Sequence, residues 1–196
     1  MPFHILNVIK NEKRQVDEFE DMTLLHSEII GANLEPKEMV ALLQKVYARF
    51  DQLCEENKVY KVHTIGSAYV IMGYTGKIEK NKRVRGVVVD EANRVMMTGL
   101  EMIEIVKEIR EASEGTMLEN LEIKVGVHTG KVIAGIIGSK VVRYDIFGKG
   151  ILTAKKMLLY GTPGRLFVTS DTYNVLSSQP DIANEYLFTE ALTFNI

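Results

Sequence analysis

The stretch from Leu121 to Tyr173 constrains the fold of this chain more than any other part of the sequence. It contains two runs rich in β-branched residues, Leu121 to His128 and Lys131 to Ile137, with Thr129 and Gly130 between them. Strand-forming runs separated by a short glycine-containing link are typical of a β-hairpin. We therefore expect two strands joined by a turn at Thr129-Gly130.

The rest of this stretch alternates turn, helix and strand signals. The expected elements are a turn over RYDIFGKG, a helix from about Ile151 to Tyr160, a strand from Arg165 to Thr169, a short helix from Asp171 to Leu176, and a last strand from Tyr186 to Phe188.

The first half of the chain has a similar mixture of elements. We expect a first strand over Phe3 to Lys10, a charged loop over NEKRQVDEFED, a helix beginning at Pro36, a hairpin over Tyr60 to Gly73 that turns at Gly66-Ser67, and a second helix carrying Ala92 to Val106. Strand, helix, hairpin, helix and strand in this order predict an α+β fold. Its core is a ferredoxin-like βαββαβ unit, with extra carboxy-terminal strands and helices.

Length and composition limit the alternatives. A chain of 196 residues with 46% hydrophobic content is expected to form one domain over residues 1–196. The net charge of -2 gives no reason to expect nucleic acid as a partner. Cys54 is the only cysteine, and no signal peptide or long apolar run is evident, so we expect an intracellular protein without direct membrane insertion.

Two short features suggest phosphate binding without establishing it. The run GKIEKNKRVRG is strongly basic, but such runs are usually solvated loops. The glycines at 126, 130, 135 and 138 do not form a GxxxxGK[ST] or GxGxxG pattern, so turns and close packing explain them better.

Three segments, GVHTGKVIAGIIG, VRYDIFG and GTPGRLFVTSDTY, resemble the catalytic domain of class III nucleotide cyclases. EPKEMVALLQKVYARFDQL and KVHTIGSAYVIMG are similar to the first helix and the central hairpin of that family, and RYDIFGKGILTAKKM looks like the ciliate and apicomplexan members. The resemblance implies the nucleotide cyclase fold. It also implies formation of a 3′,5′-cyclic nucleotide and pyrophosphate from ATP or GTP, at a site shared by two domains.

The family's mechanism uses two aspartates that hold two divalent metal ions. The first ends the first strand in a FADI-like motif, and FEDM places Asp21 at that position, unless FHILNVIK is the true strand. The second follows the hairpin glycine, where this chain has Ser67. A neutral hydroxyl does not replace an anionic ligand. The resemblance therefore implies Mg²⁺ or Mn²⁺ only if a partner domain supplies the aspartates.

The base-reading and transition-state positions are also altered. Family members select adenine with lysine and aspartate, or guanine with glutamate and cysteine, and this chain has His63 and Asp145 there. An asparagine and, four residues later, an arginine stabilise the transition state, and these positions hold Leu152 and Lys156. Serine after the hairpin glycine is typical of the base-reading half of heterodimeric adenylyl cyclases.

The resemblance therefore predicts a cyclase homology domain that is inactive alone. We expect it to pair head to tail with another cyclase homology domain, in a heterodimer or homodimer, and to complete a composite site. Two alternatives stay open: a non-catalytic dimerisation or scaffold module, and a nucleotide-sensing pseudocyclase.

Overall fold

A computed structural model describes residues 16–73, 84–113, 115–138 and 143–189 of the chain. The strand expected at Phe3 to Lys10 and most of the basic run at residues 76–86 lie outside these ranges. In chain order the elements are β1 (Val16–Ile30), α2 (Pro36–Glu56), β2 (Tyr60–Ile65), β3 (Ala68–Met72), α3 (Arg85–Glu111), β4 (Glu122–Ile137), β5 (Arg143–Phe147), α4 (Lys149–Tyr160), β6 (Leu166–Val168), α5 (Ser170–Leu176) and α6 (Pro180–Ala183).

The strands form one mixed sheet in the order β2-β3-β1-β4-β5. Neighbouring strands along this path are antiparallel, and β6 joins β4 in parallel. The elements from β1 to β4 follow the expected βαββαβ order, so the α+β fold class is confirmed. The helix beginning at Pro36 and the hairpin turning at Gly66, with φ of 58°, are confirmed as well.

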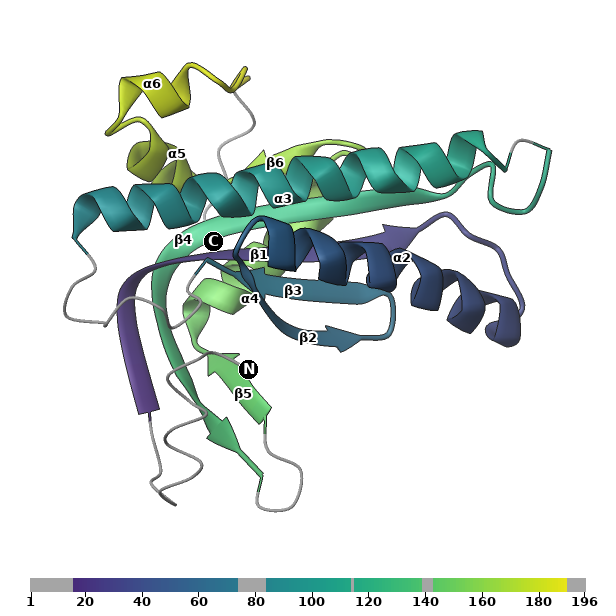
Figure 1. Cartoon of the computed structure of the whole chain (residues 1–196), viewed down its shortest axis with the longest axis horizontal. Coiled ribbons are helices and arrows are strands. Elements are labelled where there is room, and N and C mark those ends of the chain that lie inside the picture. The colour runs from purple at the N-terminus through teal and green to yellow at the C-terminus, as the bar shows by residue number, and fades with distance from the viewer. Residues whose placement is uncertain (1–15, 74–83, 114, 139–142, 190–196) are drawn as a thin grey trace.

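Helices pack on both faces of the sheet, and β4 shows the alternation that allows this. The side chain of Val125 points to α3, where Gly99 leaves room for Leu25 and Val125. The next residue, Gly126, faces α4 so closely that a Cβ there would lie 2.5 Å from the Ala154 carbonyl oxygen. Figure 1 shows α3 running alongside β4 for most of its length. Among the described helices, none is both long and apolar enough to cross a membrane.

The far ends of β1 and β4 curve away from the helices and, together with β5, form an arm (Figure 1). A cluster of buried apolar side chains around Phe19, Tyr144 and Ile146 fills the base of this arm. The Tyr144 hydroxyl donates a 2.6 Å hydrogen bond to the buried carboxylate of Asp17, which joins β5 to β1.

The charged run before Asp21 is not the solvated loop that the sequence suggests. Its second half belongs to β1, where Asp17 and Phe19 are buried while Glu18 and Glu20 are exposed. The two exposed carboxylates bind Lys131 of β4, at 2.7 and 3.0 Å. The run alternates with period two, so its charge density hid a half-buried strand.

The turn expected at Thr129-Gly130 is also wrong, because β4 continues through it as one strand. Gly130 pairs with Met22 of β1, and the ring of His128 folds over it: a Cβ on Gly130 would lie 2.5 Å from the imidazole Nε2. This glycine therefore makes room for a side chain and does not form a turn.

Two carboxy-terminal expectations need correction. The segment RYDIF, expected as part of a turn, is strand β5 and pairs with the end of β4. The segment Tyr186 to Phe188 is not a strand; it packs by its aromatic rings, with Phe188 5.1 Å from the ring of Tyr173. Tyr186 and Phe188 are partly buried against the core, whereas Leu187 between them is 94% exposed.

Candidate nucleotide site

The two candidate base-reading residues contact each other directly. His63 lies on β2 and Asp145 on β5, 82 residues apart in sequence, and their Nδ1 and Oδ1 atoms are 2.9 Å apart. Both side chains are about one-fifth exposed. The amide of Ile146 also donates to Asp145 Oδ1, so two donors hold this carboxylate oxygen. The pair is ordered and reachable from solvent.

A buried histidine that the sequence did not single out lies beside this pair. His26 of β1 and His63 of β2 both lie opposite Val70 of β3, so all three share one face of the sheet. His26 is 7% exposed, and its Nδ1 has no hydrogen-bond partner among the described residues. Burial, followed by the charges of Lys155 and His63, lowers the pKa of His26 from 6.5 to about 4.

The depressed pKa of His26 predicts a loss of stability in acid. The unfolded chain takes up this proton as the pH falls below 6.5, whereas the folded chain resists it until about pH 4. At pH 5 the resulting loss in the free energy of unfolding is about 2 kcal/mol. Denaturant unfolding at pH 7.5 and pH 5 measures it, with His26→Phe as the control because it removes this titration. The same pH dependence in both proteins would contradict this role of His26.

The hairpin turn lies next to the end of β1. The Ile29 amide donates to the Ser67 carbonyl oxygen at 2.9 Å, and Glu28 pairs in register with Ala68. Glu28 is half-buried. Burial of the Tyr47 hydroxyl, and to a lesser extent the charge of Glu28, raises the pKa of Tyr47 to about 12. The Tyr47 hydroxyl in turn donates to the Gly66 carbonyl oxygen of the turn. The acidic residue that the fold brings to Ser67 is therefore Glu28.

Asp21, the residue expected there, is not brought to the turn. It lies at the bulge of β1 between Phe19 and Met22, seven residues before Glu28, which corresponds to about 23 Å of strand. The segment HSEI (His26–Ile29), rather than FEDM, lies near the end of β1 beside the hairpin turn. The described residues hold no group of three His, Cys, Asp or Glu side chains able to bind a metal ion.

The two candidate transition-state positions lie on α4. Leu152 and Lys156 are four residues apart and therefore lie on one side of the helix, and both are exposed. Leu152 is 59% exposed, like several other large apolar side chains of the described residues. This side of α4 is open to a second molecule.

Comparison with known sequences identifies the family. Residues 14–193 match the family model described as the adenylate and guanylate cyclase catalytic domain. A membrane guanylyl cyclase of Dictyostelium discoideum is 31% identical over 97% of this chain, and guanylate cyclase alpha of Plasmodium falciparum is 34% identical over 100% of it. The matched segments make up 12% and 5% of those relatives, so this chain spans only a small part of their length.

Solved structures agree with this result. The catalytic core of a rhodopsin-guanylyl cyclase with converted specificity, in complex with ATPalphaS, is 28% identical, with a TM-score of 0.66 over 83% of this chain and 84% of that one. A dimeric guanylyl cyclase domain from the fungus Blastocladiella emersonii is 26% identical, with a TM-score of 0.67 over 83% and 86% of the two chains. This chain belongs to the adenylate and guanylate cyclase catalytic domain family.

Proposed function

We propose that this chain is the base-reading half of a composite nucleotide cyclase site and prefers ATP to GTP. The contact between His63 Nδ1 and Asp145 Oδ1 is the observation that carries the proposal. It places an imidazole and a carboxylate side by side where relatives that use adenine place lysine and aspartate.

The chemistry of this pair suits adenine. The Asp145 oxygen that neither His63 nor Ile146 engages is an acceptor for the exocyclic amino group of adenine. Guanine carries a carbonyl oxygen at that position, which would face a carboxylate at a cost in binding free energy.

The proposal assigns one metal-binding carboxylate to this chain, and it is Glu28. Glutamate oxygen is a suitable ligand for Mg²⁺ or Mn²⁺, but Ser67 beside it is neutral. When bound, such ions activate the ribose hydroxyl and neutralise the triphosphate. A single carboxylate is a weak site, so a partner domain supplies the aspartates of the composite site. Association between cyclase domains has precedent among the relatives: one solved guanylyl cyclase domain is described as a non-canonical dimer, and another relative is named as a soluble guanylate cyclase subunit.

The α4 residues set how much catalysis this half contributes. Lys156 supplies a positive charge toward a phosphate, whereas Leu152 offers no hydrogen bond. The loss of one positioned donor slows such reactions by roughly a hundredfold to a thousandfold. Because leucine offers no hydrogen bond at this position, Leu152 also favours a second candidate function, a nucleotide-sensing or scaffold domain that pairs without turnover.

Calorimetric titration of the chain with ATP and with GTP tests the base preference. We expect ATP to bind about tenfold more tightly than GTP, and Asp145→Asn to weaken ATP binding by about tenfold, the effect of one hydrogen bond to a charged group. Asp181→Asn, on the exposed surface of α6, is the matched control and should leave both affinities unchanged. Equal affinities for ATP and GTP, or an Asp145→Asn variant that binds ATP normally, would refute the assignment.

A further inference from the structure

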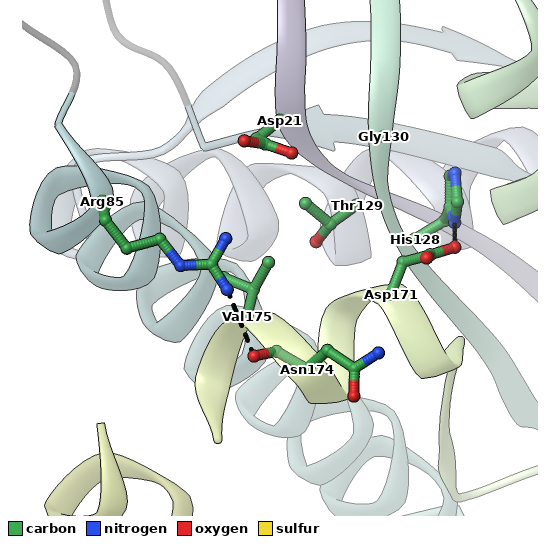
Figure 2. A pocket seen from close by; sticks show the side chains of 8 residues that line it. All are labelled: Asp21, Arg85, His128, Thr129, Gly130, Asp171, Asn174 and Val175. Carbon is green, nitrogen blue, oxygen red and sulfur yellow. Dashed lines mark hydrogen bonds and ion pairs between the residues drawn. The ribbon is translucent and has the colours of Figure 1, made fainter. Parts of the chain in front are cut away.

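A cavity of about 370 Å³ lies on the side of the molecule where α3 begins and α5 packs against the sheet. Most of its lining residues have polar side chains, and they come from four elements (Figure 2): Asp21 of β1, Arg85 of α3, His128, Thr129 and Gly130 of β4, and Asp171, Asn174 and Val175 of α5. This volume is at the lower end of the range for small-molecule sites, roughly 300 to 1,000 Å³. Neither His63, Asp145 nor Glu28 lines it, so it is separate from the proposed base-reading site.

A chain of buried hydroxyl groups fixes one wall of the cavity. Thr129 Oγ1 lies 2.8 Å from Thr23 Oγ1 and donates to Thr172 Oγ1 at 3.2 Å. Thr172 contacts Thr169, whose hydroxyl lies 3.0 Å from Nδ1 of His128. Four threonines and one histidine thus tie β1, β4 and α5 together beneath the cavity. A wall held in this way is pre-organised and does not have to order itself when a ligand binds.

Arg85 brings a positive charge to the opposite wall. Its described contacts are with two neutral oxygens, the Asn174 carbonyl at 3.2 Å and Ser178 Oγ at 3.4 Å. Its other guanidinium N–H groups are left as donors, and Figure 2 shows the group extending across the cavity. Arg85 also occupies the first turn of α3, where the helix dipole disfavours a cation. An anion in the cavity would accept hydrogen bonds from the remaining guanidinium N–H groups and would offset the unfavourable position of this cation at the start of α3.

The other charged groups in the lining are carboxylates. Asp171 lies 3.8 Å from His128 Nδ1. Burial lowers the pKa of His128, so the imidazole beside Asp171 is mostly uncharged at neutral pH. Asp21 contributes a second carboxylate from β1. Figure 2 shows Arg85 and Asp171 on opposite sides of the cavity. The lining therefore has a positive end, a negative end and neutral hydrogen-bonding groups between them.

We infer that this cavity binds a small zwitterion of the α-amino acid class, with its carboxylate on Arg85 and its ammonium group on Asp171. The Asn174 side chain also lines the cavity and provides hydrogen bonds to the ligand. The site ties the start of α3 to α5, so a bound ligand stabilises the folded chain.

Calorimetry and thermal unfolding of the full chain with each standard L-amino acid test the inference. We expect at least one amino acid to bind saturably and to raise the unfolding temperature. Acetate and methylammonium, which each carry one of the two charges, should bind at least tenfold more weakly. Failure of every amino acid to bind at millimolar concentration overturns the inference, and so does equal binding of acetate, which would indicate a simple anion site.

Variants locate the binding. Arg85→Gln and Asp171→Asn should each weaken the best amino acid at least fivefold. Arg165→Gln and Asp181→Asn are exposed controls of the same chemistry and should have no effect. Asp171 has a side chain that is 65% exposed, so its variant should fold normally and decides the matter if Arg85→Gln is unstable. Unchanged binding by Asp171→Asn contradicts the inference.

Discussion

Replacing Gly31 with alanine is expected to lower the free energy of unfolding by about 3 kcal/mol, which combines a backbone cost and a packing cost. Gly31 has φ of 80°, a left-handed conformation that costs an alanine about 1 to 2 kcal/mol. A Cβ at this position would also lie 1.8 Å from the Asn120 carbonyl oxygen. Backbone cannot move aside as a flexible side chain does, so the ends of β1 and β4 must separate.

Denaturant unfolding checks this prediction, with Gly164→Ala as the matched control. Gly164 has a similar φ of 71°, but no atom lies within 4 Å of the position of its Cβ. The control therefore carries the backbone cost alone, about 1 kcal/mol. The predicted difference between the two variants is about 2 kcal/mol from the close contact. Equal destabilisation would mean that the approach of Asn120 to Gly31 does not constrain the fold.

The second large effect is expected at the hairpin turn. Ser67→Asp should increase the affinity of the chain for Mn²⁺ at least tenfold, because it places a second carboxylate beside Glu28. Calorimetric titration with Mn²⁺ measures the change directly.

Two variants make this result specific. Ser67→Asn has nearly the size of the aspartate variant but no charge, so it should bind Mn²⁺ like the unmodified chain. Glu28→Gln, introduced together with Ser67→Asp, should abolish the gain. If the aspartate and asparagine variants bind Mn²⁺ equally, Glu28 is not the metal-binding partner of position 67.

Local signals predicted most of the helices and the hairpin. Pro36 and the apolar positions that follow it indicated α2, because proline fixes φ at a value that suits the first turn of a helix. Gly66 indicated the turn between β2 and β3, because glycine readily adopts the positive φ found there. The order of these elements then predicted the α+β fold class. These features depend on short segments whose structure does not require a distant partner.

Long-range pairing accounts for the errors. Gly130 looks like a turn residue in sequence, but β4 continues through it because Gly130 pairs with Met22 of β1. RYDIF becomes a strand because it pairs with the end of β4, and the charged run before Asp21 becomes one because Lys131 lies across from it. In each case a residue far away in the sequence or on another strand decides the structure.

The candidate site was predicted in part for the same reason. His63 and Asp145 were identified by position, although nothing in the sequence indicates that they contact each other. Asp21 was chosen by a local match to FEDM, whereas register with the hairpin favours Glu28. His26 carried no sequence signal beyond a polar residue within an apolar strand.

Formation of cyclic nucleotide from ATP and GTP, in the presence of Mn²⁺, tests the central claim most directly. The chain as the base-reading half should give no product alone. It should give cyclic AMP when mixed with a cyclase domain that keeps both metal-binding aspartates, and Asp145→Asn should reduce that yield. Product from the chain alone, or cyclic GMP in place of cyclic AMP after mixing, would contradict the account.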